Sequence, residues 1–349
     1  MTYAPTTSAL SKTVIQSRTR YLRRRQALLS VVVLVVLVLF CCTLTFGQTY
    51  VPFSNVMRIL AGENVPGAGF TVGQLRLPRA VLGLVAGISF GLGGAAFQTL
   101  LRNPLASPDI IGITSGASAA AVFAIVILGI SGPAASVFSV LAGLAVALLV
   151  HGLSYRNGVS GARLILVGIG VSAMLESMIV YILSRAPAFS LQEAMRWLTG
   201  SLNGAKLEMA GPLLLALVVF GSVLLVKARD LEVMRTGEDT ATALGVNVSS
   251  TRLLIIVSAV GLIATATAIT GPIAFVAFLA GPIAAGLFGR RHSILLPAGL
   301  VGATLVLASD FVGQFLLPGR YPVGVVTGAL GAPYLIILII RSNRQGAAS

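Results

Sequence analysis

Long apolar segments recur along almost the whole chain, and they constrain its fold more than any other feature of the sequence. A membrane-spanning helix requires roughly 20 predominantly apolar residues. Ten segments of about that length can be placed, at residues 27–46, 77–100, 110–130, 134–153, 162–184, 209–227, 252–270, 273–289, 294–317 and 321–340. The remaining residues of the 349 are too few for a separate soluble ATPase or receptor domain. The sequence therefore predicts an all-α polytopic membrane protein of about ten transmembrane helices.

Basic residues are unevenly distributed between the two sides that these spans define. Ten spans place both chain ends on one side, so residues 1–26 form a basic tail, residues 27–341 a single transmembrane domain and residues 342–349 a second tail. The side with both ends carries 17 of the 24 Lys and Arg residues. Because basic residues are enriched in cytoplasmic loops, we expect both termini to be cytoplasmic. The net charge of +14 is thus a topology signal and indicates no nucleic acid partner.

Two carboxylates fall inside predicted spans, Glu176 in residues 162–184 and Asp310 in residues 294–317. A charge at bilayer depth costs at least about 3 kcal/mol unless it is paired or faces water. Both residues are therefore candidates for a transport pathway. Asp310 has a structural alternative, because near the outer end of its span it can cap backbone groups or pair with an arginine. Glu176 lies deeper, where a water-lined cavity or a protonated carboxyl would explain it.

Small residues and one polar loop add two further expectations. Glycines at four-residue spacing, as at Gly83, Gly87 and Gly91, are typical of closely packed membrane helices. In the longest cytoplasmic loop, residues 228–251, Thr236 can cap a short helix that Gly245 ends. From spacing alone, this helix is either a docking element or an amphipathic linker.

Five blocks of sequence, in this order, resemble the permeases of ABC importers for iron–siderophores, haem and cobalamin, the FecCD family. They are Arg76-Leu-Pro-Arg79, then Arg102-Asn-Pro-Leu-Ala106 with Pro108-Asp109, then Gly237-Glu238 to Leu244-Gly245-Val246, then Gly271-Pro272-Ile273, and finally Pro322 to Thr327 with Gly331-Ala332-Pro333. The resemblance covers residues 76–341 and implies the type II importer fold. Within the family, residues 197–204 and 281–283 look more like the ferric catecholate-siderophore (enterobactin-like) branch than the cobalamin branch.

The resemblance implies a role for several residues. Arg76 and Arg79 would dock an extracytoplasmic siderophore-binding protein, while Gln314 replaces a third docking arginine for which Arg320 could compensate. The residues that would form the coupling helix against a cytoplasmic ATPase dimer are Gly237, Glu238, Asp239, Leu244 and Gly245. Those that would form the cytoplasmic gate are Ser160, Gly161 and Ala162.

The sequence thus predicts a permease subunit that moves a ferric siderophore across the bacterial plasma membrane beside a second, identical or homologous, permease subunit. The chain contains no Walker A, dinucleotide-binding or Cys/His metal pattern. We therefore expect no cofactor in this chain and no enzyme activity of its own, with ATP and Mg bound by the partner ATPase. The alternatives are a cobalamin or haem importer of the same family, and an ion-coupled secondary transporter that uses Glu176 and Asp310.

Overall fold

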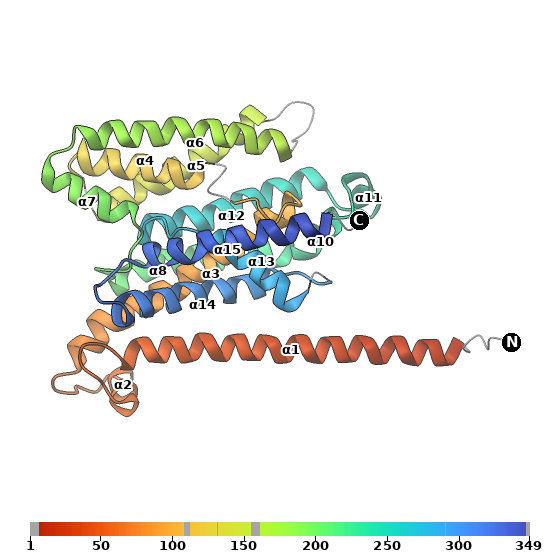
Figure 1. The fold of residues 1–349 in the computed structure, drawn as a ribbon, viewed down its shortest axis with the longest axis horizontal. Helices are drawn as coiled ribbons and strands as arrows, with labels where there is room; N and C mark the ends of the chain where they lie inside the picture. Colours follow the sequence, from red (N-terminus) through yellow and green to blue (C-terminus); the bar gives the residue numbers. More distant parts are fainter. Residues whose placement is uncertain (1–6, 108–111, 131, 155–160, 290, 347–349) are drawn as a thin grey trace.

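The regular structure of the chain is helical throughout the residues that the computed structural model describes, which are 7–107, 112–130, 132–154, 161–289 and 291–346 (Figure 1). Seven helical stretches are long and apolar enough to cross a membrane, and three shorter helices are apolar as well. These ten coincide with the ten predicted spans.

The seven longer stretches are α1 (Thr7–Thr45), the π-helical turn η1 (Thr71–Arg76) with α3 (Leu77–Leu100), α5 (Pro133–Ser154), α6 (Gly161–Ser184), η3 (Leu207–Met209) with α8 (Ala210–Ala216), η4 (Leu217–Gly221) and α9 (Ser222–Val226), α12 (Val248–Thr270), and α14 (Leu295–Phe311) with η5 (Val312–Leu316). The three shorter apolar helices are α4 (Ile113–Val126), α13 (Val276–Phe288) and the part Val323–Leu338 of α15 (Val323–Gly346). Four short helices lie outside the spans in the described residues: α2 (Phe53–Leu60), α7 (Ala188–Leu198), α10 (Ala228–Met234) and α11 (Glu238–Ala243).

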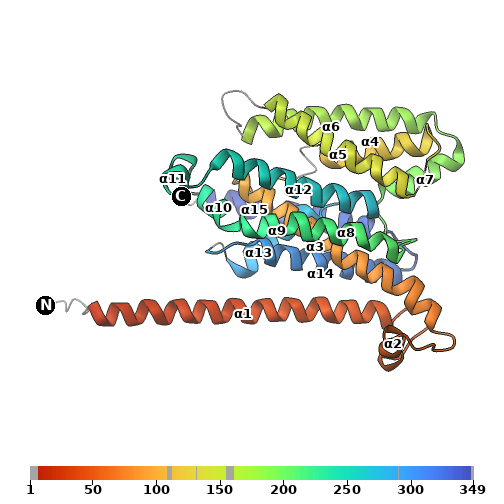
Figure 2. The same ribbon diagram turned by 180° about the vertical axis from the view of Figure 1, so that it is seen from behind.

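Helix α3 is the centre of the molecule. It packs against α14, α13 and α12, while α4, α5, α6 and α7 form a separate group joined to this core through α12 (Figures 1 and 2). Where α3 crosses α14, a Cβ atom at Gly87 would lie 2.6 Å from the Cα atom of Ala303. Only a glycine allows the two backbones to approach so closely, which confirms the packing face expected from the glycine spacing.

Helix α1 differs from the predicted division into a tail and a first span. It runs from Thr7 to Thr45 without a break at residue 26. The segment contains neither Gly nor Pro and is rich in Leu and Arg, which favour helix. At 1.5 Å per residue, its 39 residues span about 58 Å, nearly twice the thickness of the hydrocarbon core.

The two ends of the bundle carry different short helices. The amino-terminal end of α1, the carboxyl-terminal end of α15 and helix α11 lie at one end, here called the α11 end (Figures 1 and 2). Helices α2 and α7 lie at the opposite end, here called the α7 end. This arrangement is the one expected for an even number of spans.

Candidate functional site

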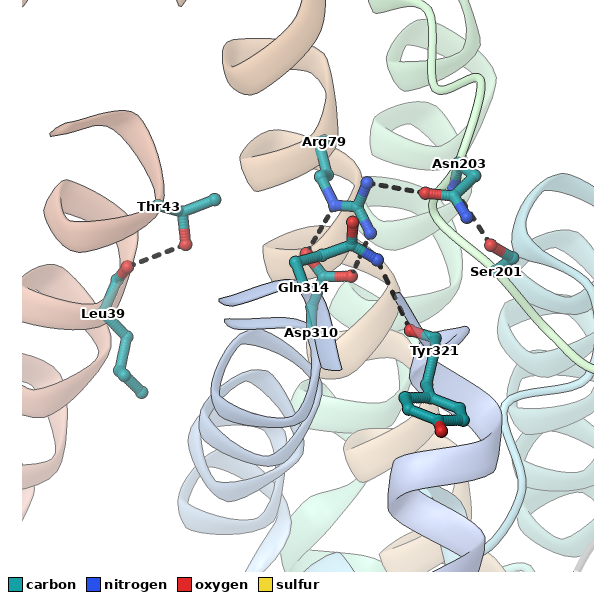
Figure 3. Close-up of polar contacts among 8 residues, drawn as sticks. All are labelled: Leu39, Thr43, Arg79, Ser201, Asn203, Asp310, Gln314 and Tyr321. Carbon is teal, nitrogen blue, oxygen red and sulfur yellow. Dashed lines mark hydrogen bonds and ion pairs between the residues drawn. The ribbon is translucent and has the colours of Figure 1, made fainter. Parts of the chain in front are cut away.

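A buried ion pair lies at the α7 end of the core. Arg79, in the first turn of α3, donates through Nε and Nη2 to the two carboxylate oxygens of Asp310 in the last turn of α14, each at 2.6 Å (Figure 3). The two side chains are only 15% and 3% exposed. A parallel two-bond geometry of this kind is the strongest form of the Arg–carboxylate interaction.

A short loop completes the polar cluster around Arg79. The remaining guanidinium nitrogen of Arg79, Nη1, donates to Oδ1 of Asn203 at 2.8 Å, and the backbone N–H of Asn203 donates to Oγ of Ser201 at 3.1 Å (Figure 3). Gln314 lies beside the pair and donates to the carbonyl of Tyr321 at 3.4 Å. All three guanidinium nitrogens of Arg79 therefore form hydrogen bonds within the chain.

These contacts explain why a carboxylate is tolerated at Asp310. Because both of its oxygens are bound by Arg79, its charge is neutralised and hydrogen-bonded, as the depth of the residue requires. The structure favours the structural alternative for Asp310, pairing with an arginine, over a place on a transport pathway.

Three loops that are distant in sequence meet next to this cluster. The N–H of Gly324 donates to the carbonyl of Gly200 at 3.0 Å, and the N–H of Ser201 donates to the carbonyl of Thr270 at 2.7 Å. Gly200 has a φ of +64°, and a Cβ atom there would collide with the carbonyl of Pro272. Three of the segments that carry the family resemblance thus converge, and they hold Asn203 against Arg79.

Arg76 occupies a different environment from the one expected of a docking residue. Its side chain is buried, and its guanidinium donates to the carbonyls of Leu44, Thr45 and Thr49 at 3.0, 2.9 and 2.6 Å. Orphan carbonyls at the end of α1 are satisfied in this way. Arg76 therefore fixes the connection between α1 and α2, and in this conformation it presents no guanidinium to a partner. Arg320 is exposed at the same end of the bundle.

Glu176 lies on the wall of a cavity of about 490 Å³ between α4, α6 and the segment that precedes α13. Thr114, Ser115 and Thr267 contribute hydroxyl groups to the wall, which is otherwise mostly apolar. The hydroxyl of Thr267 is buried and has no hydrogen-bond partner among the described residues. Glu176 is exposed beside this open space and forms no ion pair with the described residues.

The α11 end carries the predicted short helix, with a different start. The hydroxyl of Thr236 donates to the carbonyl of Val233, so the prediction that Thr236 caps the helix is wrong. Gly237, with a φ of +127°, takes the capping position, because the preceding turn of α10 has already engaged Thr236. Gly245, with a φ of +85°, follows the helix as expected.

Part of the surface of α11 packs against the bundle. Glu238 pairs with Arg252 at the start of α12, and Ala241 is fully buried. Asp239 is exposed, and the side chain of Leu244 is 67% exposed. The exposed part of the predicted coupling helix therefore includes Asp239, Leu244 and Gly245, and the side chain of Glu238 stays half exposed beside Arg252.

A contact that spacing did not reveal joins this region to the core. Arg102, at a φ of +53° just after α3, donates to the carbonyl of Met234 in α10 at 2.7 Å.

Of the predicted gate residues, Ser160 lies outside the described residues, Gly161 begins α6, and the side chain of Ala162 is likewise outside them. Pro108 and Asp109 also lie outside the described residues.

An all-helical bundle with ten apolar stretches in the described residues is the architecture of a polytopic membrane protein. Residues 34–341 match the FecCD transport family, and the chain belongs to that family. Its members are permease subunits of ABC importers, which are transport components rather than enzymes, so the predicted class is confirmed.

Curated relatives cover nearly the full chain. The chain is 40% identical over 303 residues to the ferric enterobactin transport system permease protein FepG of Escherichia coli, covering 86% of this chain and 91% of FepG. It is 35% identical to FepD, the second ferric enterobactin permease of that organism, over 90% of this chain and 95% of FepD. It is 33% identical to the iron(3+)-hydroxamate import permease FhuG of Bacillus subtilis, over 90% of this chain and 97% of FhuG.

The fold also matches a solved structure. A structure described as an inward-facing conformation of a metal-chelate type ABC transporter superposes with a TM-score of 0.81 at 28% identity, covering 90% of this chain and 99% of the other. The predicted ABC importer permease fold is therefore confirmed.

Proposed function

We propose that this chain carries a ferric siderophore across the bacterial plasma membrane as one of two permease subunits of an ABC importer. The observation that carries the proposal is its 40% identity to FepG, which extends over 91% of that ferric enterobactin permease. Relatives named for hydroxamate, achromobactin and ferric citrate transport support the siderophore class more broadly.

The transport path in this proposal runs along the face of α6. That helix exposes large side chains, including Met174, Val180 and Tyr181, and the cavity with Glu176 lies beside it. A second permease subunit, identical or homologous, would cover this face and close the cavity into a central path. The predicted gate residues Ser160, Gly161 and Ala162 would then close the path toward the cytoplasm.

The two ends of the bundle would meet different partners. At the α11 end, Asp239 and Leu244 project from the short helix toward a cytoplasmic ATPase dimer, which would bind ATP and Mg²⁺. At the α7 end, exposed arginines such as Arg320 and Arg196 would meet acidic residues of a siderophore-binding protein. This assignment places both termini in the cytoplasm, as the distribution of basic residues predicts.

Uptake of radiolabelled iron tests the proposal. The chain is expressed with its partner permease, ATPase and binding protein in cells that lack their own siderophore permeases, and iron is supplied as a catecholate or a hydroxamate chelate. We expect ATP-dependent uptake of at least one ferric siderophore, with no competition from cobalamin or haem. Uptake of cobalamin, to whose import permease in Halobacterium salinarum the chain is 34% identical, with no uptake of any ferric siderophore, would contradict the assignment.

A further inference from the structure

The part of α1 that precedes its apolar segment carries five arginines within eight residues: Arg18, Arg20, Arg23, Arg24 and Arg25. The first Asp or Glu of the sequence is Glu63, so α1 offers them no carboxylate. The match to the FecCD family begins only at residue 34. These two basic turns of helix are therefore a feature that the family assignment leaves unexplained.

One face of this basic segment is held against the protein. The hydroxyl of Tyr21 donates to the carbonyl of Phe288 at 3.1 Å, and Arg25 donates to the carbonyl of Ser293 at 2.8 Å. The ring of Tyr21 also stacks on His292 with a centroid distance of 5.4 Å, and the guanidinium of Arg291 lies over the same ring. The loop between α13 and α14 thus fixes the rotation of α1 about its own axis.

The opposite face carries the other arginines and continues the lipid-facing side of the helix. Eleven residues make about three turns of an α-helix, so positions eleven apart share a face. Arg20, Arg23 and Arg24 precede Val31, Leu34 and Val35 by that interval, and these three apolar side chains are 40–59% exposed. The same interval leads from Arg25 to Val36, which is buried.

Arg23 and Arg24 lie at the height of the lipid headgroups, and Arg20 lies one turn further out, just beyond that layer. The apolar segment begins at Ala27, so at 1.5 Å per residue Arg23 and Arg24 lie about 5 Å beyond it and Arg20 about 10 Å. The headgroup layer of one leaflet is roughly 5 to 8 Å thick. All three side chains are exposed, and none has a hydrogen bond or ion pair with the described residues.

From this geometry we propose that Arg20, Arg23 and Arg24 form a contact site for the phosphate groups of anionic phospholipids in the cytoplasmic leaflet. A cluster of basic residues immediately beside a membrane helix attracts anionic lipid by about 1 kcal/mol per residue, or roughly fivefold in affinity each. Protein is the less suitable occupant, because α1 lies at the edge of the bundle away from α11 (Figures 1 and 2), and the three arginines continue the side of α1 whose apolar residues are exposed. The site does not depend on which substrate is transported.

Native mass spectrometry of the full chain, released from lipid nanodiscs that contain phosphatidylcholine and cardiolipin, tests the proposal. Replacing Arg20, Arg23 and Arg24 together by Gln should lower the affinity for cardiolipin by on the order of 100-fold. Replacing the same three residues by Lys should keep most of the binding, because the charge is retained. A matched control, Arg185→Gln with Arg196→Gln and Arg320→Gln, removes three positive charges at the α7 end and should leave this binding in place.

Two outcomes would overturn the proposal. One is unchanged cardiolipin binding in the triple Gln variant; the other is loss of ATPase-subunit binding in that variant without loss of lipid, which would assign the surface to a protein. Since the triple Gln variant also weakens a topology signal, a second measurement uses the unaltered protein. Amide hydrogen exchange of residues 18–26 should be slower in nanodiscs with cardiolipin than in pure phosphatidylcholine, and equal rates would contradict the proposal.

Discussion

Arg79 and Asp310 stand 231 positions apart in the sequence, yet their side chains meet in two hydrogen bonds of 2.6 Å at the α7 end of the bundle. The pair links the first turn of α3 to the last turn of α14, two helices that also share a close backbone contact at Gly87 and Ala303. Charge pairing and glycine packing therefore fasten the same two helices at different heights.

Removing one member of this pair should destabilise the protein. Asp310→Asn leaves the guanidinium of Arg79 buried without a counter-charge, which typically costs about 3 to 5 kcal/mol. Thermal unfolding in detergent should show a clear fall in Tm. The matched control is Asp239→Asn, an exposed carboxylate at the other end, which should change Tm little. An unchanged Tm for Asp310→Asn would mean that the pair contributes nothing to stability.

Arg76 is expected to act on structure rather than on partner binding. Arg76→Gln removes hydrogen bonds to three carbonyls near the end of α1, at a cost of about 1.5 to 3 kcal/mol for each bond to a charged donor. Amide exchange of residues 46–52 should therefore become faster. Arg58→Gln breaks only an exposed ion pair with Glu63 and should leave exchange unchanged. Normal exchange in the Arg76 variant, together with loss of binding-protein affinity, would instead support the docking role.

Docking on the α7 end should depend on exposed arginines and on salt. Arg196→Glu with Arg320→Glu should weaken association with the siderophore-binding protein, most strongly at low ionic strength, because exposed charges are screened over about 10 Å at 0.1 M salt. Surface plasmon resonance over a salt series measures the effect. The control reverses two charges at the α11 end, Arg229→Glu and Arg235→Glu. Equal affinities for both variants would place the docking surface elsewhere.

Coupling to ATP can be separated from coupling to an ion. Reversing Glu238 and Asp239 to Lys should abolish uptake if α11 contacts the ATPase, whereas Glu176→Gln should leave uptake largely intact. The control Asp230→Lys reverses a charge on neighbouring α10. The opposite result, with uptake lost in Glu176→Gln and retained in the α11 variant, would favour the ion-coupled secondary transporter.

The crossing of α3 and α14 should not tolerate an added methyl group. Gly87→Ala places a Cβ against the backbone of α14, where overpacking costs about 1 to 3 kcal/mol. Gly211→Ala is the matched control, because nothing lies within 4 Å of the added atom. Melting temperatures of the two variants should differ clearly, with Gly211→Ala equal to or above the unaltered protein.

Hydropathy was sufficient to predict the ten apolar helices, because a membrane requires long uninterrupted apolar runs wherever the chain crosses it. Hydropathy did not predict how far α1 continues, because a helix can extend beyond its apolar residues into water. The absence of Gly and Pro from residues 7–45 was the available signal.

The polar contacts were harder to predict. Pairing with an arginine was one of the alternatives for Asp310, but the choice between Arg76 and Arg79, three residues apart, depends on which of them faces α14. Rotation of α3 is set by packing against several helices at once, so it cannot be read from local spacing. The convergence of the loops at Gly200, Gly271 and Gly324 likewise depends on backbone contacts between distant segments.

The contact between α3 and α14 also limits how the molecule can move. Two helices whose backbones touch over glycines, and whose ends are pinned by an ion pair, cannot slide past one another without a collision, because close-packed interfaces do not deform continuously. The two helices should move as one rigid unit. The group of α4, α5 and α6 should rotate relative to this unit when the permease changes between its outward-facing and inward-facing states. Spin labels on α3 and α14 should therefore keep a constant separation through the transport cycle, while a label on α6 changes its distance from both.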